Sequence, residues 1–316
     1  MANEIIMFTD TLVYSSLLTL MTVGLTLTYM TTKVPNFAHG TFATLGIYVS
    51  LVLSKLLGLN IYYGILPSFI IAGGVAVLQY IMVLKPLTKR NASVTTLMVA
   101  TLAFEFLLLS FLNIFADYLS RTFLVTSRYF LLASLDFSLL GQRGVIVVAP
   151  IMVVLITLCL YLLLTKTKFG IAMRATIENP SLAGTVGINT SLIYTISWFM
   201  AGGLAGLAGS LLPLWFIGNV NTGSILLISI FAAAVTGGLG NIYGAVIGGY
   251  IVGGAEILII RVLASMPEPF GAWIIPYRPL IPLLAMVITL LIAPSGLTGI
   301  NLQTLKKRLW RKENAK

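Results

Sequence analysis

Two carboxylates lie far inside long apolar stretches of the sequence. Glu105 is near the middle of the stretch 94–115, and Glu256 is about halfway along the stretch 243–264. A charged side chain at the centre of a bilayer costs about 3 kcal/mol on insertion scales, so it normally faces protein or water. Glu256 could be a structural hydrogen-bond acceptor or line a solute path, and Glu105 could be protonated. Arg261 follows Glu256 by five positions, too far for a good pair on one helical face.

A short polar break near the N-terminus holds Asn36 and His39. In PNFAHG, residues 35–40, a proline and a glycine interrupt the helical pattern. Broken helices at membrane depth can supply polar groups to a solute path. The favoured interpretation is simpler: both side chains cap helix ends beside the membrane surface. His39 is the only histidine and Cys159 the only cysteine, so we expect no metal site.

Motifs for catalysis are missing from the sequence. It contains no GxxxxGK[ST] phosphate loop, no nucleophile elbow and no HExxH pair. We therefore expect no ATP site, no cofactor on this chain and no enzymatic activity.

Composition indicates the elements that must position these residues. The chain has 316 residues, of which 58% are hydrophobic and 9% charged, against roughly 25% charged in soluble domains. Helices are the expected spanning structure, because the apolar stretches are unbroken and do not alternate as in a barrel. We predict an all-α polytopic membrane protein of about 8–10 transmembrane helices forming one transmembrane domain, 1–316. Nine candidate spans lie near 11–30, 40–57, 61–84, 94–115, 143–165, 191–215, 224–240, 243–264 and 279–299.

The sequence leaves open whether the turns 31–39 and 237–242 each dip into the membrane. The first span is not expected to be a removable signal peptide, because the residues before it, MANEIIMFTD, are acidic where a signal peptide is basic.

The basic residues predict an orientation. With nine spans, thirteen of the nineteen Lys and Arg residues fall in one set of loops. Short basic loops stay in the cytoplasm, so we expect the amino terminus outside and the carboxyl terminus inside. The basic tail 300–316 is expected to rest on anionic lipid, and the net charge of +10 does not indicate nucleic-acid binding.

Small residues recur four apart in two spans. Such spacing lets helix backbones approach closely in lipid, and packing is the favoured role; sliding of helices along a solute path is the alternative. The predicted packing positions are Gly202, Gly206, Gly240, Gly244, Gly248 and Gly253.

The semi-polar stretch 167–188, TKFGIAMRATIENPSLAGTVGI, separates two apolar spans. Residues 168–178 could continue the preceding span. Asn179 then fits an N-cap, Pro180 a first helical position and Gly187 a left-handed cap. Two isolated turns are unstable alone, so this helix must pack on its own chain or on a partner. It is either an ordinary loop helix or a coupling helix.

This stretch resembles the cytoplasmic coupling segment of permease subunits in branched-chain amino-acid ABC importers. Further blocks match the same family in order: GLTLTYMTTKVPNFAHGTFATLGIY (24–48), AAVTGGLGNIYGAVIGGYIVGGAE (233–256) and PSGLTG (294–299). Glu256 ends the glycine-rich block, whereas Glu105 matches no feature of the family. The extracellular stretch 117–143 is the least similar part.

The resemblance implies a passive subunit of the cell (inner) membrane. It would pair with a second permease, as a heterodimer, and work with two cytoplasmic ATP-binding subunits that hold ATP and Mg, and with an external solute-binding protein. The coupling segment, about 166–189, would contact the ATPase through Phe169, Gly170, Met173, Arg174, Asn179, Pro180, Leu182, Ala183, Val186 and Gly187. A possible translocation path would use Asn36, His39, Glu105 and Glu256.

Three functions compete. The importer permease is favoured, with leucine, isoleucine and valine as the family's usual substrates and other amino acids, amides or urea as alternatives. An ion-coupled secondary transporter would usually carry more ionisable residues in its spans, and a membrane enzyme would need clustered polar residues. Asn219 and Asn221 could meet solute or a binding protein, although turn chemistry is the favoured account.

Overall fold

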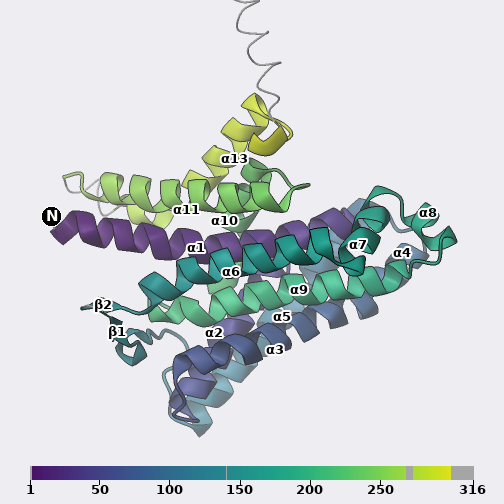
Figure 1. Ribbon diagram of the computed structural model, residues 1–316. Helices are drawn as coiled ribbons and strands as arrows, with labels where there is room; N and C mark the ends of the chain where they lie inside the picture. Colours follow the sequence, from purple (N-terminus) through teal and green to yellow (C-terminus); the bar gives the residue numbers. More distant parts are fainter. Residues whose placement is uncertain (1, 140, 268–272, 300–316) are drawn as a thin grey trace, which may run out of the picture.

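The computed structural model describes residues 2–139, 141–267 and 273–299, and these are almost entirely helical (Figure 1). The predicted basic tail, 300–316, lies outside the described residues. The elements are α1 (Ala2–Thr32), α2 (His39–Lys55), α3 (Ile65–Gln79), α4 (Lys85–Lys89), α5 (Val94–Thr122), β1 (Ser138–Leu139), β2 (Gln142–Arg143), α6 (Val145–Lys166), α7 (Lys168–Glu178), α8 (Pro180–Thr185), α9 (Thr190–Leu211), α10 (Thr222–Gly237), α11 (Ile242–Ala264) and α13 (Leu280–Ile292). A π-helical turn, Tyr80–Leu84, joins α3 to α4.

Each of the nine predicted spans contains a helix, but two of these helices are short. Among the described residues, seven helical stretches are long and apolar enough to cross a membrane; two of them include the turns that flank α3 (Ile61–Lys89) and α13 (Ile275–Gly299). In contrast, α2 has 17 residues and α10 has 16, below the roughly 20 that a crossing needs. The predicted ranges 40–57 and 224–240 are corrected accordingly: each holds a helix that begins inside the molecule rather than at its end.

α1 is the central helix of the bundle. Within its apolar window 89% of residues are buried, against 28% for α5 and 22% for α6. α1 lies between α11 and α9 in Figure 1. Its small polar side chains make this possible: Ser16, Thr19 and Thr22 donate to the carbonyls four residues earlier, so their buried hydroxyls are satisfied within the helix.

Five of the six predicted packing glycines lie directly against a neighbouring helix. A Cβ on these residues would crowd the neighbour: Gly202 with Ala76, Gly206 with Ala72, Gly244 with Gly237, Gly248 with Ala233 and Gly253 with Ser15. The prediction is wrong for Gly240, which is exposed in the turn after α10 and has open space where a Cβ would be. The spacing of four placed it on one helix with Gly244 and Gly248, whereas that helix, α11, begins two residues after it, at Ile242.

The segment 237–242 is a tight turn between antiparallel helices. Gly238 has φ +108°, and Asn241 caps α11 by accepting a hydrogen bond from the backbone N–H of Tyr243 at 2.9 Å. The other turn, 31–39, is described with the site.

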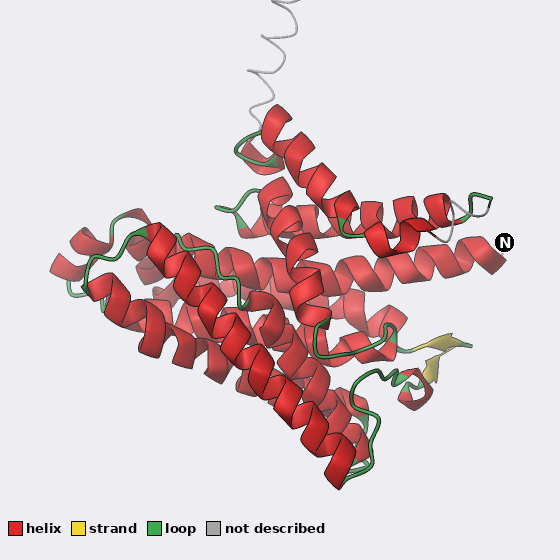
Figure 2. Cartoon of the chain, turned by 180° about the vertical axis from the view of Figure 1, so that it is seen from behind, coloured by secondary structure: helices red, strands yellow, loops and turns green. Residues whose placement is uncertain are grey.

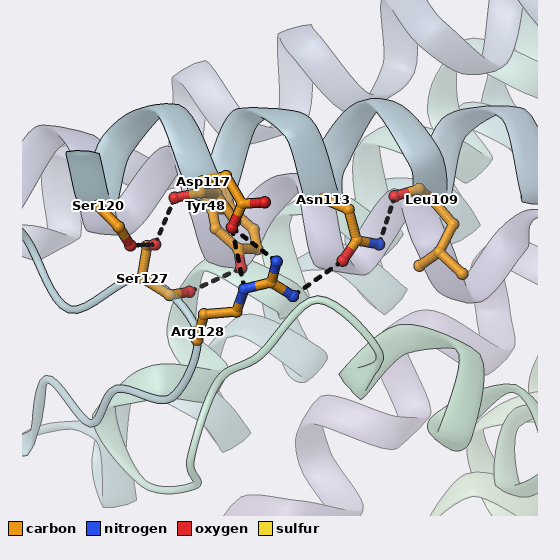
Figure 3. A network of polar contacts seen from close by, with 8 residues as sticks. Tyr48, Leu109, Asn113, Asp117, Ser120, Ser127 and Arg128 are labelled. Carbon is orange, nitrogen blue, oxygen red and sulfur yellow. Dashed lines mark hydrogen bonds and ion pairs between the residues drawn. The ribbon is translucent and has the colours of Figure 1, made fainter. Parts of the chain in front are cut away.

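The N-terminus and the β1–β2 hairpin share one end of the molecule, and α4, α7 and α8 share the other (Figures 1 and 2). At the hairpin end, the stretch after α5 is tied down by hydrogen bonds (Figure 3). Tyr48 donates to the carbonyl of Ser127 at 2.8 Å, and Arg128 pairs with Asp117 at 2.6 Å. This stretch, the least family-like part of the sequence, is thus held against both α2 and α5.

Candidate functional site: a capped helix at one end and a charged cavity at the other

α7 is a separate helix and does not continue α6 as predicted. Thr167 has extended φ and ψ of −110° and 155°, and its hydroxyl accepts from the N–H of Gly170 at 3.1 Å, which makes it the N-cap of α7. Gly170 packs so closely on the carbonyls of Leu163 and Leu164 that a Cβ would overlap them. Good helix formers could not reveal this break, because the cap and the glycine contact redirect the chain.

α7 buries the face on which two predicted contact residues lie. Gly170 and Met173 are buried, as is Thr176, and the sulfur of Met173 lies 4.0 Å from the hydroxyl of Ser197 on α9. Arg174 is exposed and Phe169 is half-buried. The buried pair therefore fastens α7 to its own chain.

α8 has the local structure that the sequence predicts. The side chain of Asn179 accepts from the N–H of Leu182 at 3.0 Å, and Pro180 is the first helical residue. Gly187 has φ +86°; its N–H donates to Gly184, and the N–H of Ile188 donates to Ala183. This pair of bonds is the Schellman arrangement of a helix C-terminus.

The apolar side chains of α8 divide between two faces. Ala183 is 3% exposed and packs on its own chain, whereas Leu182 is 62% exposed and Val186 70% exposed. Ala183 therefore anchors α8, and Leu182 and Val186 face outward. α8 lies at the extreme end of the molecule, beside α7 and far from the N-terminus (Figure 1).

Asn36 and His39 lie deep within the bundle. After α1, residues 33–38 turn back along it, and the His39 ring Nε2 bonds the carbonyl of Met21 at 2.8 Å. Met21 precedes the end of α1 by eleven residues, or roughly 16 Å of helix. Gln79 donates to the Asn36 side chain at 3.0 Å. The favoured interpretation of surface caps is corrected, because α3 holds the break inside.

Glu105 lies where the first turns of α2 and α10 meet. Its carboxylate accepts from the hydroxyl of Ser224 at 2.8 Å and is 6% exposed. The hydroxyl of Thr44 in turn accepts from the N–H of Gly223 at 3.1 Å. Glu105 thus connects α5 to the start of α10.

Glu256 has two partners that the sequence did not indicate. Tyr14 donates to one carboxylate oxygen at 2.8 Å, and the Nε of Arg278 donates to the other at 2.6 Å. Arg261 pairs instead with Asp10. Tyr14 and Arg278 are 264 positions apart in the sequence (278 − 14), so no local spacing could identify them; the available signal was only an unpaired acid in one span.

The three residues border a cavity of about 470 Å³ in the half of the molecule away from α8. Its polar lining comprises Tyr14, Asn219, Thr222, Ser229, Glu256 and Arg278. Asn219 also accepts from the N–H of Asn221 at 2.8 Å, which is turn chemistry. Among the described residues, no group of three or more His, Cys, Asp or Glu side chains could hold a metal ion.

Residues 7–293 match the family model described as "Branched-chain amino acid transport system / permease component". The chain belongs to this family. The permease is 48% identical over 298 residues to the probable branched-chain amino acid transport permease protein LivH of Methanocaldococcus jannaschii, covering 94% of this chain and 93% of that protein. It is 25% identical over 294 residues to the high-affinity branched-chain amino acid transport system permease protein LivH of Salmonella typhimurium, covering 89% and 90%.

The fold is similar to that of a chain in the solved structure of PsaBC from Streptococcus pneumoniae in complex with Fab. The TM-score is 0.52 at 15% identity, over 93% of this chain and 97% of that one. The permease is accordingly a multi-pass inner-membrane protein and a transporter subunit of an ABC importer, a class that works with ATPase and binding-protein partners. This assignment favours the importer over the ion-coupled alternative.

Proposed function

We propose that this permease forms the membrane path for leucine, isoleucine and valine and is driven by separate ATPases through α8. The observation that carries the coupling role is the exposure of Leu182 and Val186 on a fully capped helix at one end of the molecule. A six-residue helix cannot be stable by itself. Its caps and the buried Ala183 hold it in place, which leaves the two apolar side chains available to a partner.

The contact surface we propose is smaller than the predicted set of contact residues, because some of those residues are buried. Leu182 and Val186 insert into a groove of the ATP-binding subunit, and the exposed Arg174 borders it. Gly170, Met173 and Ala183 position the surface from behind. Asn179, Pro180 and Gly187 fix the backbone, so their effect is on the shape of α8.

The basic residues at the α8 end of the molecule indicate how the permease is oriented in the membrane. Lys85, Lys89 and Arg90 lie in and beside α4, Lys166 ends α6 and Lys168 begins α7. The α8 end is therefore basic, and we place it in the cytoplasm. The N-terminus and the hairpin then face outward, toward a binding protein. A second, non-identical permease completes the path, and ATP and Mg are held by the ATPase subunits and not by this chain.

Reconstitution tests the energy source. The permease, its partner permease, the ATPases and the binding protein are placed in liposomes, and uptake of radiolabelled L-leucine is measured with ATP and no ion gradient. We expect accumulation with ATP and none with a non-hydrolysable ATP analogue. Uptake that follows a proton or sodium gradient without ATP would overturn the proposal.

A further inference from the structure

The cavity beside Glu256 combines one pair of opposite charges with apolar walls. Leu212, Phe216, Ile217, Ile225 and Leu226 supply apolar lining. The Glu256 side chain is 4% exposed and that of Arg278 30% exposed, and their contact is 2.6 Å. A cavity of about 470 Å³ is within the range of about 300–1,000 Å³ typical of small-molecule sites.

Arg278 is fixed in place and retains an unused donor. Its guanidinium lies over the ring of Tyr14, 4.4 Å from the centroid, while Nε binds Glu256. The Nη2 atom is buried and has no hydrogen-bond partner among the described residues. A buried guanidinium N–H without an acceptor is costly, and a carboxylate is the group that its planar fork fits best.

The charges at the site also select against simple ions. Glu256 and Arg278 neutralise one another, so an added anion or cation alone would leave one buried charge uncompensated. A zwitterion brings both signs: its carboxylate can pair with the guanidinium of Arg278, a side chain that is 30% exposed and lines the cavity. Its ammonium can take Glu256, which has lone pairs beyond those used by Tyr14 and Arg278.

We infer that this cavity is a substrate site of the permease, where Arg278 and Glu256 bind the carboxylate and ammonium of an α-amino acid and the apolar wall receives its branched side chain. The inference rests on the proposed function. Because one methylene in an apolar pocket changes binding only about 10–200-fold, the site discriminates weakly among leucine, isoleucine and valine, and strongly against molecules that lack either charge.

Ligand-induced thermal stabilisation tests the site on the assembled complex of permeases and ATPases, without the binding protein. Millimolar L-leucine should raise the unfolding midpoint of the complex. Isopentylamine, which lacks the carboxylate, and 4-methylpentanoate, which lacks the ammonium, should not. In Arg278→Gln and Glu256→Gln complexes the leucine-induced shift should vanish, and ATP-driven leucine uptake should fall at least tenfold.

Two variants separate this role from a structural one. Arg128→Gln removes an arginine that pairs with a different carboxylate, Asp117, at the same end of the molecule, and should leave the leucine shift intact. Arg278→Lys keeps the charge beside Glu256 but loses the planar guanidinium fork. This variant replaces Arg278→Gln in the test if Arg278→Gln does not fold. It should need about tenfold more leucine to reach half of the maximal thermal shift. A leucine shift in the Arg278 variants equal to wild type overturns the site, whatever energy source drives uptake. Wild-type uptake without ATP overturns the proposed function instead.

Discussion

Gly40 and Gly223 lie backbone against backbone. A Cβ on either residue would overlap the carbonyl oxygen of the other. Gly40 belongs to the first turn of α2 and Gly223 to the first turn of α10, so the two short helices begin at a shared point inside the bundle. Glu105 and Ser224 are hydrogen-bonded beside this point.

Gly40→Ala should destabilise the permease by about 1–3 kcal/mol, because the added methyl group meets backbone that cannot give way. The measurement is the thermal unfolding midpoint of the purified protein in detergent. Gly74→Ala on α3 is the matched control, since nothing lies within 4 Å of its Cβ position. Equal midpoints for the two variants would show that α2 and α10 do not touch here.

The Glu105–Ser224 bond should appear as a coupling in a double-mutant cycle. Glu105→Leu and Ser224→Ala each remove one partner, and their interaction energy should be about 1 kcal/mol, the range found for hydrogen bonds between membrane helices. Pairing Glu105→Leu with Ser110→Ala should give no coupling, because the hydroxyl of Ser110 binds the carbonyl of Phe106 on its own helix. Chemical unfolding of the four variants of each cycle supplies the energies.

Leu182→Asp should weaken docking of the ATPase by about 2 kcal/mol, because it places a charge in an apolar contact. Transport per ATP hydrolysed in proteoliposomes should fall while membrane insertion is unchanged. Ser181→Asp adds the same charge to an exposed neighbour on α8 and should have little effect. Normal coupling in Leu182→Asp would make α8 an ordinary loop helix.

Gly187→Val should strain the end of α8 by about 1–2 kcal/mol, the cost of a left-handed conformation for a residue with a Cβ. Crowding does not contribute, since the Cβ position is open space. Gly187→Asn should retain most coupling, because asparagine tolerates this conformation. The ratio of leucine uptake to ATP hydrolysis distinguishes them; identical ratios in both variants would contradict the role of the left-handed cap.

Local signals in the sequence determined the helices and the caps of α8. Asn179, Pro180 and Gly187 act through bonds that reach only three or five residues, and apolar runs specify spans because lipid requires every backbone group to be satisfied within the helix. These patterns need no knowledge of the rest of the chain. They failed at Gly240, where residue spacing did not reveal the turn between α10 and α11, and at the start of α7, where the Thr167 cap and the contact of Gly170 with Leu163 and Leu164 redirect the chain.

Tertiary structure alone decided the depth of His39, the burial of Met173 and Ala183, and the partners of Glu256. His39 meets the middle of α1 because α2 is docked there by Gly40 and Gly223. Glu256 contacts Tyr14 and Arg278 because α11 packs against both α1 and α13. Pairings of this kind depend on which helix faces are brought together, and spacing along one helix carries no information about its neighbour.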